Sequence, residues 1–332
     1  MSASLPEPVL AFLRQHGLAA EGEVPRAEAL SGGVSSDIWR VDLKGGPVCV
    51  KRALPRLRVA QLWEAPVERN AYERRWLETA NAIVPGVAPK VLAGDEDAHA
   101  GCFAMEYLPR LPVWKAELSA GRADAAFAAD VGRKLGAIHN ATAHRADLAA
   151  AFATDASFYA LRLEPYLLAT GKAHEDLRGQ FEKLVDTTAN TRLALVHGDV
   201  SPKNVLVGPQ GPVFLDAECA WYGDPAFDLA FCLNHLLLKG VWVPARKAAF
   251  LACYDALARE YLASVDWEQP AALERRAAAL LPGLLLARVD GKSPVEYLTD
   301  EADRARVRAF ARRFLQSPAA TLREVGDAWQ ES

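Results

Sequence analysis

The sequence predicts an α+β fold in two parts, a small antiparallel sheet followed by a larger, mainly helical region. Between Ala27 and about residue 108, short β-branched or aromatic runs alternate with turn residues, which is typical of strands and hairpins. After Pro109 the apolar residues recur at helical spacing. We therefore expect an N-terminal part over residues 1–108 and a C-terminal part over residues 109–332.

The first part opens with an amphipathic helix, because residues 8–16 place their apolar side chains on one side. Strand and turn signals follow, and a second helical pattern interrupts them. The expected elements are a helix at 8–16, a strand, glycine turn, strand, hairpin turn and strand over 29–51, a helix at 66–80, and strands at 92–95 and 102–108.

The second part reads as a set of helices that surround one polar loop. A turn at Gly223-Asp224-Pro225 should start a helix, with Asp224 as its cap. The expected helices are residues 123–139, 156–168, 175–190 and 300–324.

Composition excludes several classes of protein. The 332 residues are 51% hydrophobic and 24% charged, as in ordinary globular proteins. The net charge of −4 argues against a nucleic-acid binder, which would present a basic face. The N-terminus has no signal-peptide layout, and the longest apolar run, 277–287, is too short to cross a bilayer and is broken by Pro282. We expect a cytoplasmic protein without membrane or nucleic-acid partners; the sequence carries no signal of oligomeric state.

The cysteines are odd in number and widely spaced, and most lie inside apolar runs. They fit small core residues of a protein in a reducing compartment, and their spacing matches no zinc motif. They are Cys49, Cys102, Cys219, Cys232 and Cys253.

The strongest chemical pattern lies in residues 196–207 and 213–218. Asp199 and Asn204 stand five residues apart in a polar loop between two β-branched runs, and Asp216 ends the second run. Phosphoryl transfer needs a carboxylate that orients a hydroxyl and accepts its proton, and oxygen ligands that hold Mg²⁺ on the nucleotide phosphates. Asp199 is the predicted base, and Asn204 and Asp216 are the predicted metal ligands. The alternative is that these residues only form a hairpin turn.

This pattern resembles the H-R-D-x-x-x-x-N and D-F-G motifs of protein kinases, with Gly198 in place of arginine and Asp216-Ala217-Glu218 in place of D-F-G. In that altered form it is similar to the aminoglycoside phosphotransferase and choline kinase family of small-molecule kinases. The resemblance implies a two-lobe protein-kinase-like fold that binds ATP and Mg²⁺ in its cleft. It also implies that Asp228 supports the catalytic loop, and we interpret His139 as a packing residue.

The glycine turn and the strand after it supply candidate phosphate contacts. Backbone N–H groups at Gly32 and Gly33 can approach phosphate oxygens, and Ser35 and Ser36 add hydroxyl donors. A plain hairpin turn explains the glycines equally well. Lys51 follows on the third strand at the position of the kinase lysine that pairs with nucleotide phosphates; otherwise it would simply point to solvent.

The resemblance also assigns the partner of this lysine and the hinge. Glu73 stands where a kinase helix supplies a glutamate to the lysine, with Glu68 as the rival position; both could instead lie on a solvated face. The segment Met105-Glu106-Tyr107-Leu108 resembles the kinase hinge. It implies that the Glu106 carbonyl and the Leu108 amide bond the adenine edge and that Met105 lines the pocket.

One subgroup, methylthioribose kinase, matches further. The likeness rests on Lys51, Arg58, Trp63, Arg69 and Glu73, and on the run Asp216-x-Glu218-x-Ala220-x-Tyr222-Gly223. Its D-x-E motif makes Glu218 a third candidate metal ligand. The match is incomplete: Asn204 is absent from the subgroup's catalytic loop, and Arg288 and Lys292 stand where the subgroup places paired arginines against its substrate.

The sequence therefore predicts an ATP-dependent small-molecule kinase that phosphorylates a hydroxyl of a sugar-like or amino-alcohol metabolite, with a methylthioribose-like sugar favoured. The alternatives are an aminoglycoside O-phosphotransferase and a non-catalytic nucleotide-binding module of the same fold. A protein kinase is disfavoured, since only about eight residues separate Asp216 from Asp224, too few for a peptide-docking segment.

Overall fold

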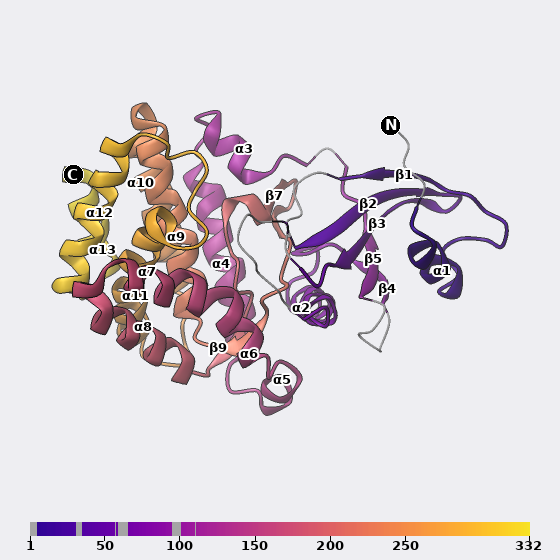
Figure 1. Cartoon of the computed structure of the whole chain (residues 1–332), viewed down its shortest axis with the longest axis horizontal. Coiled ribbons are helices and arrows are strands. Elements are labelled where there is room, and N and C mark those ends of the chain that lie inside the picture. The colour runs from indigo at the N-terminus through magenta and orange to yellow at the C-terminus, as the bar shows by residue number, and fades with distance from the viewer. Residues whose placement is uncertain (1–4, 31–34, 57, 59–65, 95–100, 110) are drawn as a thin grey trace. The chain divides into compact units, whose positions relative to one another are not determined.

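The computed structural model describes residues 5–30, 35–56, 58, 66–94, 101–109 and 111–332, and Figure 1 labels its elements. It divides into two compact units. Unit 1 is Met1–Leu111 together with Asp216–Glu218, and unit 2 is Pro112–Leu215 together with Cys219–Ser332. The chain therefore leaves unit 2 for the Asp-Ala-Glu segment and returns directly.

Unit 1 contains a five-stranded antiparallel sheet in the order β1-β2-β3-β5-β4. Its elements are α1 (Glu7–Gln15), β1 (Arg26–Ala29), β2 (Ser36–Leu43), β3 (Gly46–Ala53), α2 (Arg69–Ile83), β4 (Val91–Gly94) and β5 (Cys102–Glu106).

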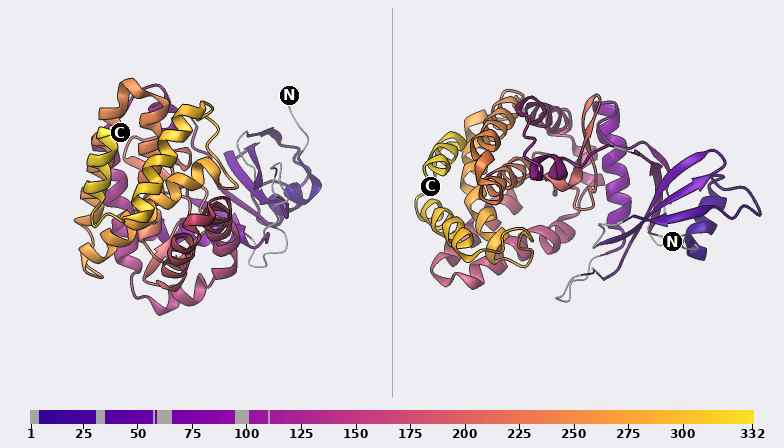
Figure 2. Two further views of the ribbon diagram at one scale, coloured as in Figure 1. Left: turned by 60° about the vertical axis from the view of Figure 1, so that its left-hand side comes forward. Right: turned by 90° about the horizontal axis from the view of Figure 1, so that it is seen from above.

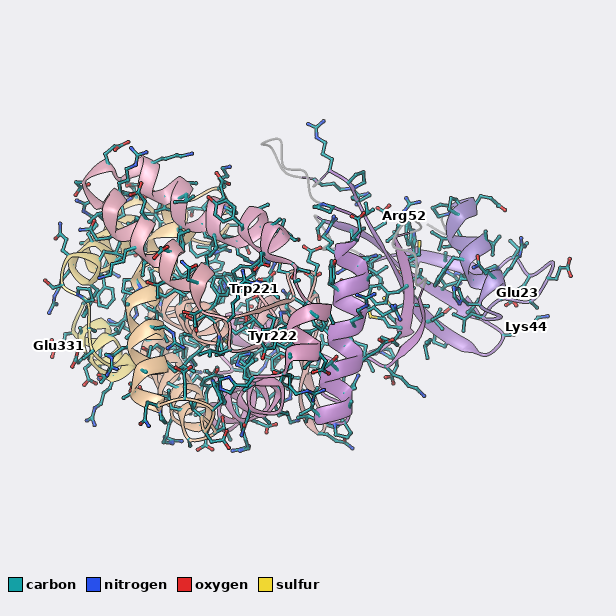
Figure 3. The ribbon with its side chains drawn as sticks, turned by 90° about the horizontal axis from the view of Figure 1, so that it is seen from below. Glu23, Lys44, Arg52, Trp221, Tyr222 and Glu331 are labelled. Atoms are coloured by element: carbon teal, nitrogen blue, oxygen red, sulfur yellow. The ribbon has the colours of Figure 1, made fainter. Side chains whose placement is uncertain are left out.

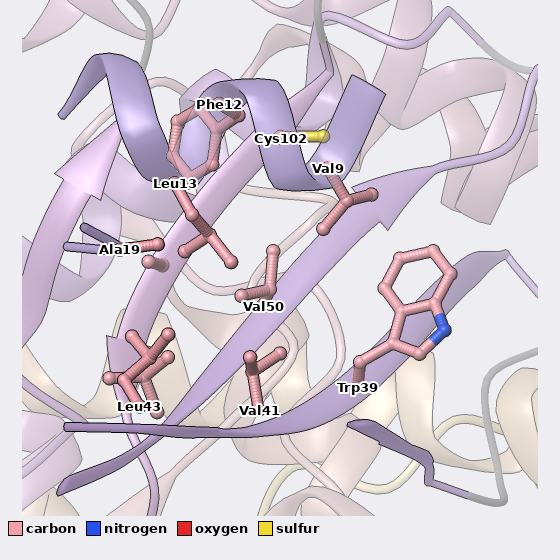
Figure 4. Packing of buried hydrophobic residues seen from close by; sticks show 11 residues of the cluster. Val9, Phe12, Leu13, Ala19, Trp39, Val41, Leu43, Val50 and Cys102 are labelled. Atoms are coloured by element: carbon pink, nitrogen blue, oxygen red, sulfur yellow. The ribbon is translucent and has the colours of Figure 1, made fainter. Parts of the chain in front are cut away.

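The first helix covers one face of this sheet (Figure 4). Val9, Phe12 and Leu13 are buried on the side of α1 that meets Val50 and Trp39. Their spacing of three and four residues is what a helix needs to form one apolar stripe. Each such side chain contributes roughly 1.5–3 kcal/mol when fully buried, so α1 is anchored to the sheet.

The β2–β3 hairpin is tied to the segment that follows α1. The Lys44 backbone N–H donates to the Glu23 carboxylate at 3.1 Å, and Figure 3 labels both residues at this end of the unit. The hairpin in turn sets the register of β3, in which Lys51 stands opposite Ile38 on β2 and Phe103 on β5.

Unit 2 is mainly helical and carries two small β-pairs, β6-β9 and β7-β8. Its helices are α3 (Trp114–Ser119), α4 (Ala125–Thr142), α5 (Ala146–Ala151), α6 (Asp155–Phe158), η2 (Tyr159–Leu168), α7 (Ala169–Ala173), η3 (Glu175–Leu177), α8 (Arg178–Asn190), η4 (Pro202–Asn204), α9 (Ala226–Trp242), η5 (Pro244–Arg246), α10 (Lys247–Leu262), α11 (Pro270–Asp290), α12 (Glu301–Gln316) and α13 (Leu322–Glu331). Its strands are β6 (Ala194–Val196), β7 (Val205–Gly208), β8 (Gly211–Phe214) and β9 (Trp221–Gly223).

The core of unit 2 forms around α9, which is buried from Ala226 to Val241. It packs against α10 and α11, and α10 packs against α4 (Figures 1 and 2). Beside this core, Tyr222 of β9, labelled in Figure 3, accepts a hydrogen bond from the Arg145 backbone N–H at 2.8 Å and donates to the Leu193 carbonyl at 3.0 Å. The predicted α+β class is confirmed.

Two predicted helices and one apolar run differ from expectation. The helix expected over 300–324 is wrong as one element, because Pro318 disfavours helical backbone at Ser317 and Thr321 then caps α13 by accepting from the Glu324 N–H. Pro282 does not break α11, which continues to Asp290. Residues 156–168 form the end of α6 and then η2, a π-helix.

All five cysteines are buried. Within the described ranges, no helix combines the length and apolar character needed to cross a membrane.

Candidate functional site

Lys51 lies at the centre of a buried ion-pair cluster in unit 1. Its amine is 2.6 Å from the Glu73 carboxylate on α2 and also contacts the Asp216 carboxylate. The side chains of Lys51 and Glu73 are only 2% and 1% exposed. The partner is Glu73 and not Glu68, because Glu68 precedes the first turn of α2. The lysine therefore does not point to bulk solvent.

The surrounding charges keep this lysine protonated. Burial by itself would lower the pKa of Lys51, but the Asp216 and Glu73 carboxylates outweigh it and raise that pKa above its ordinary value. Burial raises the pKa of Glu73, with Lys51 acting in the opposite direction. The result is a fixed cation beside a carboxylate that is easier to protonate than an exposed glutamate.

Asp216 adopts a backbone conformation that most residues avoid. Its φ is 65°, in the left-handed region that costs a residue with a Cβ about 1–2 kcal/mol. Such strain persists where surrounding structure holds it, and it concentrates at functional sites. The Asp216 side chain stays 29% exposed while contacting Lys51, so its carboxylate can also reach a ligand.

Glu218 is paired with Arg69, whose role sequence analysis missed. The Arg69 Nε lies 3.1 Å from the Glu218 carboxylate, and the guanidinium also donates to the carbonyls of Pro66 and Leu54, both at 2.7 Å. It donates to the Ser35 carbonyl as well. Arg69 thus connects α2, the segment after β3 and the Asp-Ala-Glu segment. The sequence clue to this residue was the resemblance to methylthioribose kinases, which includes Arg69.

Of the predicted phosphate contacts, Gly32 and Gly33 lie outside the described residues. Ser35 and Ser36 are buried at the start of β2. The Ser36 hydroxyl is buried and makes no hydrogen bond within the described part of the chain. A buried hydroxyl without a partner is costly, and a phosphate oxygen would satisfy it.

The predicted hinge leaves β5 after Glu106, where the strand ends. Met105 is buried, and the half-buried Leu108 stands outside regular structure. The Glu106 N–H donates to the Lys90 carbonyl at 2.8 Å. No hydrogen bond among the described residues uses the Leu108 amide, which leaves it available to a ligand.

In unit 2, the Asp199 carboxylate is held on one side only. Its Oδ2 lies 2.9 Å from an Arg162 nitrogen and 3.1 Å from the Lys203 amine. Its Oδ1 is buried and, among the described residues, has no hydrogen-bond partner. One oxygen is thus fixed by two cations, and the other is free for a substrate hydroxyl. Arg162 comes from η2, far along the chain, and carried no sequence signal.

Asp228 at the start of α9 braces the catalytic loop. Its two oxygens accept the backbone N–H groups of His197 and Gly198 at 2.7 and 2.8 Å. His139 lies 3.3 Å from the same carboxylate and 2.6 Å from the Tyr261 hydroxyl. Both residues are fully buried and structural in their contacts.

The loop itself requires Gly198. Its φ is 78°, and a Cβ there would lie 2.6 Å from the Cys219 carbonyl oxygen, so a larger residue would force the backbone apart. His197 completes the turn: its Nδ1 accepts the Asp199 N–H at 3.1 Å while its Nε2 lies 3.1 Å from the Leu215 carbonyl. This pairing puts the imidazole proton on Nε2.

Asn204 is oriented by the same loop. Its side-chain amide nitrogen donates to the Asp199 carbonyl at 3.1 Å. Its main-chain carbonyl accepts the Leu215 N–H at 2.8 Å. With the amide nitrogen engaged, the side-chain oxygen is the atom left for a ligand. The backbone bond also fixes the residue directly before Asp216.

The donor chemistry of Asn204, Asp216 and Glu218 fits Mg²⁺. All three offer hard oxygen atoms, although the Glu218 carboxylate is already engaged by Arg69. In the described ranges no three His, Cys, Asp or Glu side chains gather into a metal centre of their own. Magnesium suits such a sparse set, because it uses one or two carboxylates with water and substrate phosphates.

The two predicted substrate residues, Arg288 and Lys292, have different surroundings. Arg288 is 9% exposed on α11, where it donates to the Tyr166 hydroxyl at 3.2 Å. Lys292 lies past the helix end and pairs with the half-buried Glu164 carboxylate at 2.7 Å. The structure does not bring them together into one cationic pair.

Comparison with known proteins identifies the family. The phosphotransferase enzyme family matches residues 26–273, about three quarters of the chain. The chain belongs to this family. It is similar to methylthioribose kinase from Yersinia pseudotuberculosis, at 25% identity over 262 residues that cover 70% of this chain and 64% of that enzyme. Methylthioribose kinase from Pectobacterium atrosepticum is 24% identical over 313 residues, 81% of this chain and 78% of that enzyme. The match to the Yersinia enzyme thus spans less than two thirds of its length.

Solved structures share the fold. An amicoumacin kinase in complex with AMP-PNP, Ca²⁺ and Ami aligns over 96% of both chains with a TM-score of 0.57 and 13% identity. A choline/ethanolamine kinase family protein from Mesorhizobium loti aligns over 92% of both chains with a TM-score of 0.53 and 16% identity. These likenesses confirm the predicted protein-kinase-like fold.

Proposed function

We propose that this chain is an ATP-dependent small-molecule kinase that transfers the γ-phosphoryl group to a hydroxyl of a sugar-like metabolite. The observation that carries the proposal is the Asp199 carboxylate: Arg162 and Lys203 fix its Oδ2, and its buried Oδ1 has no hydrogen-bond partner in the part of the chain that the structure describes. A carboxylate arranged in this way can orient one hydroxyl and take its proton during transfer.

The other residues divide the work of positioning and charge neutralisation. Lys51 supplies a fixed positive charge for nucleotide phosphates, and Glu73 holds it in place. The Ser36 hydroxyl and the Leu108 amide provide donors for a phosphate and for the adenine edge. Asp228 keeps the loop that carries Asp199 in one shape.

We assign metal binding to Asn204 and Asp216, with Glu218 as a further candidate. Mg²⁺ bound there would neutralise negative charge on the nucleotide phosphates. Asp216 contributes an exposed carboxylate whose backbone is held in a strained conformation. Asn204 contributes the amide oxygen that its hydrogen bond to the Asp199 carbonyl leaves available.

A sugar-like acceptor is supported by the methylthioribose kinases among the relatives, at 24–25% identity. The proposed acceptor is therefore a hydroxylated small molecule.

The test is Asp199→Asn, which keeps the shape and one acceptor oxygen but removes the charge. We expect the rate at saturating substrate to fall by about two to four orders of magnitude, with AMP-PNP affinity nearly unchanged. ADP release measures the first quantity and titration calorimetry the second. The matched control is Asp130→Asn, a partly exposed carboxylate on α4 that pairs with Arg133.

Lost nucleotide binding with an unchanged saturated rate would make Asp199 a metal ligand and overturn its role as base. An equal fall in the Asp130→Asn control would show that the effect is not specific to the loop.

A further inference from the structure

One face of α9 links the catalytic loop to a group of buried cations. Asp228, Phe231, His235, Lys239 and Trp242 follow one another at spacings of three or four residues, so they share one side of the helix. Asp228 braces the loop at one end. Lys239, near the other end, is only 1% exposed. A lysine is almost never buried this deeply unless something pairs with it, so its surroundings need an explanation.

Aromatic rings surround Lys239, and no described carboxylate forms an ion pair with it. Its amine lies 3.5 Å from the centroid of the Tyr297 ring and 4.3 Å from that of Trp242. These two rings are stacked on each other at 4.5 Å. The nearby Lys115 lies over the same Tyr297 ring but is paired with Glu296. Ring faces attract a cation, yet they do not neutralise its charge.

Arg288 is also a buried cation without a carboxylate partner among the described residues. Its guanidinium donates to the Tyr166 hydroxyl at 3.2 Å and to the Ser293 hydroxyl at 3.0 Å, and no described carboxylate pairs with it. Its Nε is buried and unpartnered within the described ranges, as are the Tyr297 hydroxyl and the His235 Nε2. Buried polar atoms normally find partners, so several orphans in one region mark a place where a ligand completes the bonding.

This cluster is contiguous with the proposed base. Arg162, which holds Asp199, lies 5.7 Å from the centroid of the Tyr166 ring, and Arg288 lies 5.6 Å from the same centroid. Arg162 also lies 5.8 Å from the Phe231 ring, which packs against His235 at 5.4 Å. Arg288 and the residue that holds Asp199 therefore flank the same aromatic ring. Arg162 and Tyr166 both come from the π-helix η2, a geometry that is often found at functional sites.

The local charge is positive. Glu296 pairs with Lys115, and Asp199 pairs with Arg162 and Lys203. No carboxylate among the described residues forms an ion pair with Lys239 or Arg288, which contact aromatic rings and hydroxyl groups. Burial, together with the charge of Lys115, lowers the pKa of Lys239 to about 7. Burial followed by the charges of Arg288 and Lys239 lowers the pKa of His235 well below its ordinary value. Neighbouring cations that lower one another's pKa values are typical of a site that binds an anion.

We propose that the acceptor carries an anionic group, a carboxylate or a phosphate ester, which Lys239 and Arg288 bind while its hydroxyl meets Asp199. This inference rests on the proposed function, and it names the class of acceptor for the same site. Cationic acceptors such as aminoglycosides and amino alcohols would be repelled by this surface, and neutral sugars would leave its charges unpaired.

The experiment compares acceptors matched in shape and different in charge. ADP release is measured with the full chain, ATP and Mg²⁺ on glycerate against glycerol, gluconate against glucose, and ribose 5-phosphate against ribose, with methylthioribose, ethanolamine and kanamycin alongside. For at least one pair we expect kcat/KM for the acid to exceed that for its neutral partner by about 10- to 100-fold, the range that hydrogen bonds to charged groups supply. The set of acids that react shows whether the bound anionic group is a carboxylate or a phosphate ester.

Substitutions at two residues, Lys239 and Arg288, assign the effect to the cluster. Lys239→Met and Arg288→Gln should raise KM for the preferred acid by about tenfold or more while changing kcat less, because they remove ground-state contacts. Arg288→Lys should recover part of the loss, since it keeps the charge without the planar fork. Lys172→Gln, an exposed lysine on α7, is the matched control.

Binding is measured separately from turnover, by the shift in melting temperature that each acid produces in the Asp199→Asn variant. A shift that disappears on adding Arg288→Gln supports the inference. The inference of an anionic acceptor is overturned if turnover or binding favours neutral or cationic acceptors, or if no acid binds. Either result leaves the kinase assignment intact. Acid binding without any ADP release from wild type would contradict the proposed function alone.

Discussion

Lys51 in unit 1 and Lys239 in unit 2 are both almost completely removed from solvent, at 2% and 1% exposure, yet their surroundings are opposite. Lys51 contacts two carboxylates, which raise its pKa above the ordinary value. Lys239 contacts two aromatic rings, and burial lowers its pKa to about 7.

The comparison separates two uses of a buried charge. Where the protein supplies the counter-charge, the cation is positioned in advance, as a phosphate contact requires. Where the protein withholds it, the buried cation lowers stability until a ligand brings the opposite charge. Arg69 and Arg288 repeat the contrast. Arg69 pairs with Glu218, whereas among the described residues Arg288 donates to hydroxyl and carbonyl groups and pairs with no carboxylate.

The largest effect is expected for Lys51→Met, which leaves Glu73 and Asp216 facing each other. We expect unfolding free energy to fall by about 3 kcal/mol, the lower end for removing one partner of a buried ion pair, because Glu73 can take up a proton. Glu73→Ala should impair nucleotide use less than Lys51→Met does. Chemical denaturation and ADP release check both points. An unchanged stability would show that Lys51 is not held by these carboxylates.

Lys239→Met should act in the opposite direction on stability. Replacing a buried charge that has no carboxylate partner by an apolar side chain of similar length should raise unfolding free energy by about 1 to 2 kcal/mol, while kcat/KM for the acceptor falls. Denaturation of wild type and variant under the same conditions measures the difference. A marked loss of stability would mean that the Trp242 and Tyr297 rings depend on the cation, and the contrast with Lys51 would fail.

The pH dependence of the acceptor reaction should sharpen the comparison. Lys239 loses its proton in the free enzyme as pH rises through about 7, so kcat/KM for an anionic acceptor should decline above that pH. The charged and titratable groups around it are Lys115, Glu296, Arg288 and His235. Because the folded pKa lies below that of an unfolded lysine, folding releases a proton and stability should rise between about pH 7 and about pH 10. Both trends should flatten in Lys239→Met; a slope that persists there belongs to another group.

The smallest effect is expected for Lys292→Gln. Lys292 pairs with Glu164 at the surface, where an ion pair contributes about 0 to 1 kcal/mol, so unfolding free energy should change by about 0.5 kcal/mol at most. Thermal melting measures this. A large rise in acceptor KM would return Lys292 to the acceptor site that the family resemblance implies for it.

The sequence was most informative where the residues of the candidate site lie close together in the chain. The spacing of Asp199, Asn204 and Asp216 lies within one short stretch, and its loop conformation follows from Gly198 and the flanking strands. Amphipathic spacing located α1, α4 and α8 to within a few residues. The helix over 300–324 was wrong because helical periodicity outweighed the proline at 318, which stops α12.

Charge partners were harder to foresee, since they come from distant positions. In the sequence, Glu73 was favoured over Glu68 because it falls on the helix side of Trp76 and Leu77. The ion pair that decides between them needs α2 packed beside β3. Arg162 reaches Asp199 from a π-helix, and a period of 3.6 residues does not anticipate where such a helix directs its side chains.

By itself, the sequence determined the family, the fold class and the residues of the catalytic loop, because those depend on short spacings and on the periodicity of apolar residues. Only the tertiary structure decided which charges are paired. Lys239 in the sequence is one polar residue near the end of an apolar helix. Folding buries it among Trp242, Tyr297 and Arg288, contributed by α9, the segment after α11 and α11 itself. The cost of a buried charge depends on what surrounds it in three dimensions, and that is fixed by long-range packing.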